Sequence, residues 1–212
     1  MTMIKKTNIL RHLWLLVFPL FMLTACSESD NEQEEFPDWK AKNERAFNTI
    51  YNSAVEQQKA GNKTWKVFNV YSKSESVATA PEDHIVVRVL NEGTGSGSPL
   101  YTDTVSIHYR GKLLASTSYA DGYIFDSSWD GEYNISTMKP FQKRPVSNFV
   151  DGFATALQHM NIGDRWEVYI PYQLGYGKSG TTSLSIPGYS MLIFDLTLVG
   201  YSRAGTTVPD WK

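Results

Sequence analysis

The chain has 212 residues, of which 42% are hydrophobic and 13% aromatic, enough for one ordinary packed domain with additional segments. This composition excludes a chain that is disordered throughout. The formal net charge is −2, and without residues 1–25, which contain three basic and no acidic residues, it is −5. An acidic balance of this kind argues against nucleic acid as a partner.

The N-terminus has the composition of an export signal. Lys5, Lys6 and Arg11 precede an apolar stretch over 13–23, which is too short to cross a bilayer. The sequence Leu23-Thr24-Ala25-Cys26 then resembles the lipobox of bacterial lipoproteins, which predicts a signal peptide over 1–25 and a lipid on Cys26. The alternative is an ordinary secretory signal beside an incidental cysteine. Because Cys26 is the only cysteine of the chain, no internal disulfide is expected.

Residues 26–37 are polar and acidic, which predicts a tether. One interpretation is a solvated spacer that lifts the domain off the membrane. The other is a surface-export signal, because an acidic run behind a lipidated cysteine resembles that of Bacteroidetes lipoproteins.

Residues 38–60 have the periodicity of an amphipathic helix, with Asp38 as N-cap and Gly61 just beyond the end. The apolar stripe consists of Phe47, Ile50, Tyr51, Ala54 and Val55. A stripe this short favours docking on the domain, and pairing with a second copy of the chain is the alternative.

Strands are predicted over 65–71, 85–90, 104–114, 165–170 and 191–199, where β-branched and aromatic residues gather. The segment 91–99 is rich in Gly and Ser but lacks the Lys and the helix of a phosphate loop, so a connection is expected. Residues 148–160 have helical periodicity, with Asn148 as the cap and Gly163 beyond the end. Several antiparallel strands with one apolar helix across them indicate an α+β domain.

From about 85 to 201 a series of short phrases stands in a fixed order. They include Ile107-His108-Tyr109-Arg110-Gly111, Phe125-Asp126-Ser127-Ser128, Val150-Asp151-Gly152-Phe153, Leu174-Gly175-Tyr176-Gly177, Ile186-Pro187 and Leu192-Ile193-Phe194-Asp195. This order resembles that of the FKBP-type peptidyl-prolyl cis-trans isomerase family. The resemblance implies a twisted antiparallel sheet of five to six strands around one short helix, with an apolar pocket between them. It also implies an isomerase that rotates X-Pro bonds without a covalent step.

The site residues are carried over from the motifs of this family. The catalytic set is Tyr109, Asp126, Tyr176 and Phe194, and the substrate-binding set is Phe125, Phe141, Phe149, Val150, Phe153 and Ile186. Phe141 is the looser match, because residues 129–145 follow the family pattern poorly. Asp126 before two serines is also consistent with a simple turn. The four histidines are scattered, so no metal site and no cofactor are expected.

Three departures from the family pattern bear on the ligand specificity and the catalytic rate expected of the domain. Phe153 stands where members of the family usually carry Trp, residues 115–121 form an insertion, and residues 178–185 are rich in Ser and Thr. A low-activity peptide-binding module or envelope chaperone therefore remains an alternative to the isomerase, and a purely structural use of the scaffold is a third reading.

The predicted organisation is a signal peptide (1–25), a tether (26–37), an N-terminal helix with a linker or strand extension (38–80), an FKBP-like domain (81–202) and a tail (203–212). The expected partners are proline-containing polypeptides, macrolide-type inhibitors, the membrane through Cys26, and a second copy of the chain through the 38–60 helix. The expected location is the cell envelope, with the chain held by its lipid.

Overall fold

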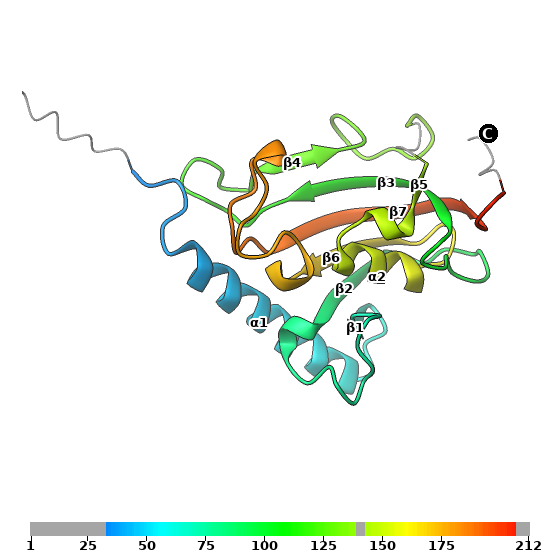
Figure 1. Cartoon of the computed structure of the whole chain (residues 1–212), viewed down its shortest axis with the longest axis horizontal. Helices are drawn as coiled ribbons and strands as arrows, with labels where there is room; N and C mark the ends of the chain where they lie inside the picture. Colours follow the sequence, from blue (N-terminus) through cyan, green and yellow to red (C-terminus); the bar gives the residue numbers. More distant parts are fainter. Residues whose placement is uncertain (1–32, 139–142, 207–212) are drawn as a thin grey trace, which may run out of the picture. The chain divides into compact units, whose positions relative to one another are not determined.

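The computed structural model describes residues 33–138 and 143–206 (Figure 1). In this part of the chain, seven antiparallel strands form one sheet in the order β1-β2-β6-β7-β3-β4, and the short β5 pairs with β3. The strands are β1 (Trp65–Asn69), β2 (His84–Asn91), β3 (Thr104–Lys112), β4 (Ile124–Ser127), β5 (Arg144–Pro145), β6 (Arg165–Ile170) and β7 (Leu192–Ser202).

One face of the sheet is covered by helix α2 (Asp151–His159), and this side holds the main core (Figure 1). The alternation that predicted the strands explains the packing: in β6, Trp166, Val168 and Ile170 are buried while the residues between them are partly exposed. The predicted α+β class, with an antiparallel sheet around one short helix, is confirmed. The sheet has more strands than the predicted five to six because β1 extends its edge and β5 adds two residues.

Helix α2 begins later than predicted. Asn148 is the last residue of a 3₁₀ turn (Val146–Asn148), and Val150 occupies the N-cap position. Phe149 and Val150 have extended backbone angles, because the chain leaves the turn there and directs both side chains toward the core. The prediction of Asn148 as the cap was therefore wrong.

Helix α1 (Trp39–Lys59) forms as predicted and docks on the domain. Phe47 and Ala54 are buried against Val86 and Met191, with Ile50 and Tyr51 packed at the border. Polar contacts fix the helix as well, since the side-chain oxygen of Asn43 accepts a hydrogen bond from the Met191 N–H at 2.8 Å. The apolar stripe is thus covered by the domain of the same chain.

The start of α1 differs from the prediction in one respect. Asp38 occupies the N-cap position, but its backbone is left-handed, with φ of 50°, and its side chain makes no capping hydrogen bond. Its carbonyl oxygen accepts the first helical bond from the Lys42 N–H at 2.9 Å. Gly61 lies beyond the end with φ of 82°, as expected for the residue that turns a chain out of a helix.

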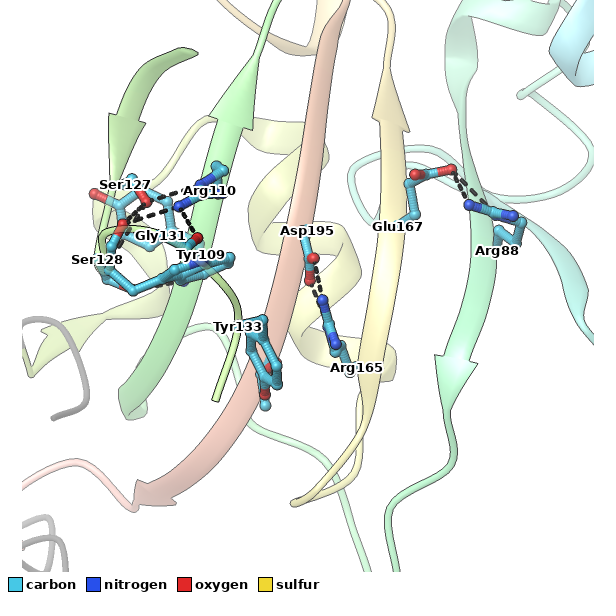
Figure 2. Close-up of polar contacts among 12 residues, drawn as sticks. Arg88, Tyr109, Arg110, Ser127, Ser128, Gly131, Tyr133, Arg165, Glu167 and Asp195 are labelled. Carbon is cyan, nitrogen blue, oxygen red and sulfur yellow. Dashed lines mark hydrogen bonds and ion pairs between the residues drawn. The ribbon is translucent and has the colours of Figure 1, made fainter. Parts of the chain in front are cut away.

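The sheet face opposite α2 carries charged side chains between its strands (Figure 2). Arg88 of β2 pairs with Glu167 of β6, and Arg165 of β6 pairs with Asp195 of β7 at 2.5 Å. The Tyr133 ring lies 3.5 Å from the guanidinium of Arg165 and so covers this second pair. Within residues 33–138 and 143–206, no helix combines the length and the apolarity needed to cross a bilayer.

Replacing Phe47 with Ala tests whether docking of α1 contributes to the stability of the domain. The substitution leaves a cavity against Val86 and Met191, and we expect the free energy of unfolding to fall by about 3–5 kcal/mol. Urea denaturation measures it. The exposed Asn52→Ala on the same helix serves as control and should change stability by less than about 0.5 kcal/mol. Equal stability of the two variants would contradict the docked arrangement.

Candidate functional site

Phe194 of β7 lies at the centre of an aromatic cluster between the sheet and α2. Its ring meets Phe153 of α2 at a centroid distance of 4.8 Å, Phe125 of β4 at 5.5 Å and Tyr109 of β3 at 6.2 Å, each nearly edge-on. Edge-to-face packing places the positive ring edge on the negative face of the neighbour and stabilises such a cluster beyond its buried area. Four residues from three strands and one helix therefore converge on one apolar wall.

The N-terminus of α2 contributes the next part of this wall. Phe149 stacks on Phe153 at 4.7 Å with an interplanar angle of 20°. Val150 follows as the N-cap residue, and its N–H has no acceptor among the described residues. The first N–H groups of any helix lack partners within the helix, so this donor is available to a bound molecule.

Tyr109 and Asp126 form the polar element of the site. The hydroxyl of Tyr109 donates to Oδ2 of Asp126 at 2.5 Å, across the pairing of β3 with β4. Burial raises the pKa of Tyr109, and the hydrogen bond to the Asp126 carboxylate raises this pKa further. The hydroxyl therefore keeps its proton and holds the carboxylate in one orientation.

Tyr176 and Ile186 come from the loops between β6 and β7. Burial raises the pKa of Tyr176, and the negative charge of Asp126 adds to this effect. No side-chain hydrogen bond of the Tyr176 hydroxyl is found in the described part of the chain, so the proton remains available for donation. Ile186 is buried, and its backbone pairs with Thr181 to close the loop.

The structure thus brings eight of the predicted pocket residues into the main core cluster or against it: Tyr109, Phe125, Phe149, Val150, Phe153, Tyr176, Ile186 and Phe194. Asp126 joins them through Tyr109. Phe141 and Cys26 lie outside the described residues. Asp126 lies within strand β4 and is not a turn residue.

The two serines after Asp126 hold the chain as it leaves β4. Ser128 accepts a hydrogen bond from the Tyr109 N–H at 2.9 Å, and Ser127 donates to the carbonyl of Trp129 at 2.7 Å. Arg110 donates to Ser127 and to the carbonyls of Trp129 and Gly131 (Figure 2). These contacts anchor the end of β4 and so fix the direction of the Asp126 side chain.

Two residues that shape the site were not among the predicted site residues. Gly111 leaves room for the rings, because a Cβ atom there would collide with Phe125 and come within 2.6 Å of Phe194. Arg144 of β5 places a positive charge near Tyr109 and Tyr176, which opposes the rise in the pKa of both. The glycine was visible as the last residue of the 107–111 phrase. Arg144 had no signal, since its stretch follows the family pattern poorly.

A separate groove of about 550 Å³ lies away from these residues. It is lined by Leu90, Asn91, Tyr133, Ile135, Ile162, Gly163, Arg165, Thr197, Leu198 and Val199. Its one charged group, Arg165, is already paired with Asp195. The groove offers no acid or free donor of the kind found beside Phe194.

The sequence and the fold were compared with those of known proteins. Residues 95–199 match the family described as FKBP-type peptidyl-prolyl cis-trans isomerase. This part of the chain therefore matches an FKBP-type domain, as the sequence phrases indicate.

Individual relatives agree with this assignment. The chain is 37% identical over 128 residues to the FKBP-type 22 kDa peptidyl-prolyl cis-trans isomerase of Escherichia coli K12, an alignment that covers 60% of this chain and 54% of the relative. It is 29% identical to the outer membrane protein MIP of Legionella longbeachae, with 73% and 58% covered. The chain thus spans little more than half the length of these curated relatives.

A crystal structure of a peptidyl-prolyl cis-trans isomerase from Pseudomonas syringae superimposes with a TM-score of 0.51 at 26% identity. The superposition covers 77% of this chain and 96% of that protein. The shared fold therefore extends over nearly all of that isomerase.

Replacing Gly111 with Ala tests the packing of the aromatic cluster. The added methyl group must displace the Phe125 and Phe194 rings, so we expect a loss of about 1–3 kcal/mol in stability and a changed near-ultraviolet circular dichroism spectrum. Gly200→Ala is the matched control, because Gly200 also lies in a strand and a Cβ there meets nothing within 4 Å. An unchanged near-ultraviolet spectrum in the Gly111 variant would show that the rings do not pack as described.

Proposed function

We propose that this chain is a peptidyl-prolyl cis-trans isomerase that rotates X-Pro bonds by non-covalent binding. The observation that carries the proposal is the position of two donors, the Val150 N–H and the Tyr176 hydroxyl, beside the cluster centred on Phe194; neither has an acceptor among residues 33–138 and 143–206. Proline-containing polypeptides are the substrate class, and macrolide-type inhibitors are expected to compete for the same pocket.

The apolar wall would lower the part of the rotational barrier that comes from amide resonance. Rotation of a peptide bond is opposed by about 18–20 kcal/mol, because it breaks the resonance that keeps the bond planar. The planar amide has a large dipole that water stabilises, whereas the twisted amide has lost much of this dipole. A wall formed by Phe125, Phe153 and Phe194 withdraws the water and so favours the twisted form.

The two donors, the Val150 N–H and the Tyr176 hydroxyl, would lower the entropic part of the rotational barrier. A substrate carbonyl that accepts from Tyr176, and a second that accepts from the Val150 N–H, would be held in one orientation over the Phe153 ring. Fixing reacting groups in one geometry lowers the entropy that must be lost at the transition state. The ring of Phe153 would support the prolyl ring from below.

Asp126 would provide a negative charge beside the rotating carbonyl. Its carboxylate, oriented by the Tyr109 hydroxyl at 2.5 Å, would lie near the carbonyl that rotates away from planarity. As the carbonyl carbon loses the electrons of the nitrogen, a nearby negative charge stabilises it, and such a group is worth a few kcal/mol when water is excluded.

The variant Tyr176→Phe tests this assignment directly. The hydroxyl has no side-chain hydrogen bond to lose in the described structure, so its removal should leave the melting temperature nearly unchanged. We expect kcat/KM on a proline tetrapeptide to fall about ten-fold, which equals about 1.4 kcal/mol at the transition state. A protease-free assay on the full chain measures it.

Tyr71→Phe controls for the loss of a hydroxyl, because Tyr71 is 56% exposed and its ring contacts His159, the last residue of α2. Turnover that is unchanged in the Tyr176 variant would remove this residue from the mechanism. Binding of the peptide by the wild-type chain without turnover would instead favour the alternative, a low-activity peptide-binding module or envelope chaperone.

The proposed location is the cell envelope, with the chain anchored by a lipid on Cys26 and the residues behind it serving as the tether. The sequence around Cys26 supports the anchor, and the Legionella relative is named as an outer membrane protein. A dimer through α1 would have to use the exposed face of the helix, because Phe47 and Ala54 are buried against the sheet of the same chain.

The variant Cys26→Ser tests the anchor. A serine hydroxyl cannot form the thioether that joins the lipid to the mature chain, so we expect the protein to lose incorporation of a labelled fatty acid and to leave the membrane fraction. Labelling followed by fractionation measures both. A serine variant that stays labelled and membrane-bound would show that the lipid is not carried by this residue.

A further inference from the structure

The segment before α1 is bound to the insertion that precedes β4. The Glu35 carboxylate accepts hydrogen bonds from the Ser116 hydroxyl at 2.5 Å, from the Ser118 N–H at 3.0 Å and from the Ser118 hydroxyl. These bonds lower the pKa of Glu35, with the bond from Ser116 as the largest cause. A charged acceptor that takes several donors is the strong form of the hydrogen bond.

Backbone contacts reinforce the same junction. The Thr117 N–H donates to the Glu35 carbonyl at 3.2 Å, and the Thr117 hydroxyl donates to the Glu34 carbonyl at 2.7 Å. Lys42, one turn into α1, donates to the carbonyl of Ala115 at 2.6 Å. Four successive insertion residues, 115–118, thus contact the N-terminal segment.

The insertion leads directly into the site. The Tyr119 and Tyr123 rings lie 5.0 Å apart, and the Tyr123 carbonyl accepts from the Leu113 N–H at 2.9 Å, which aligns the start of β4. Phe125 and Asp126 follow within three residues. A shift of the insertion would therefore move both of these site residues.

The first turn of α1 holds a second loop of the site. The Trp39 indole N–H donates to the Ser190 hydroxyl at 2.8 Å, and this hydroxyl donates to the carbonyl of Pro187 at 2.7 Å. Trp39 and Ser190 are both buried, and Pro187 directly follows Ile186. Figure 1 shows the start of α1, the loop before β4 and the loop before β7 at the same end of the sheet.

We propose that residues 35–43 are the positioning element of the prolyl-peptide site, in which Glu35 fixes the β4 wall and Trp39 fixes the Ile186 loop. This inference rests on the proposed function, because it assigns to the N-terminal extension control over substrate affinity at that site. Glu35 is hydrogen-bonded to the insertion and Trp39 to the loop before β7, so both act through the loops that they hold.

The test compares Glu35→Gln and Trp39→Phe with the wild-type full chain. Glu35→Gln keeps the shape of the side chain and removes its charge, and Trp39→Phe keeps an aromatic ring and removes the N–H donor. We expect KM for a proline tetrapeptide to rise about three- to ten-fold in each variant, because the loops shift while Phe153, Tyr109 and Phe194 stay in place. In the Trp39 variant kcat should stay within two-fold, whereas in the Glu35 variant it should also fall, because Asp126 moves with the start of β4. Glu34→Gln is the matched control, since the Glu34 contact uses its backbone carbonyl.

Hydrogen exchange supplies a readout that does not depend on turnover. The proposal expects faster exchange over 115–127 in the Glu35 variant and over 181–191 in the Trp39 variant, while β6 is unchanged. A KM and an exchange pattern equal to those of the wild type in both variants would overturn it and leave the isomerase assignment intact. A wild-type chain without turnover would contradict the proposed function, and the exchange pattern would then decide the positioning role alone.

Discussion

The packing of Phe194 against three other aromatic rings is the constraint on which the rest of the structure depends. β7 is bonded to β6 on one side and β3 on the other, so its side chains define the middle of the core. Phe194 can meet Phe153, Phe125 and Tyr109 together only because Gly111, opposite it on β3, has no side chain. The position of α2, the direction of β4 and the apolar wall all follow from this contact.

The hydrogen-bond donors of the candidate site lie at the border of this aromatic packing. A helix start always leaves N–H groups without partners, and the chain places that start, at Val150, beside the aromatic wall. Tyr176 adds a hydroxyl whose proton is retained because burial raises its pKa. Donors that have no acceptor in the described part of the chain bind a carbonyl more strongly beside apolar rings than they would in water, and for this reason we propose the cluster as a site for a peptide.

Periodicity and phrase order were sufficient to predict the α+β class, both helices and most of the residues that gather around Phe194. They failed where the outcome depends on contacts between distant loops. Asn148 has a side chain suited to capping a helix. The helix nevertheless begins only at Asp151, because Phe149 has an extended backbone that directs its ring toward the core. The hydrogen bonds that Glu35 accepts from Ser116 and Ser118 join residues about 80 positions apart. The polar sequence around Glu35 has no pattern from which they could be predicted.

The central claim is that the pocket lowers the barrier to rotation without shifting the equilibrium between the isomers. Exchange spectroscopy by NMR on an Ala-Pro peptide, with catalytic amounts of the full chain, measures this directly. The account predicts that the cis-to-trans and trans-to-cis rates both rise in proportion to the amount of protein, while the ratio of the isomers stays constant. Peptide resonances that broaden through binding while both exchange rates stay at their uncatalysed values would contradict it.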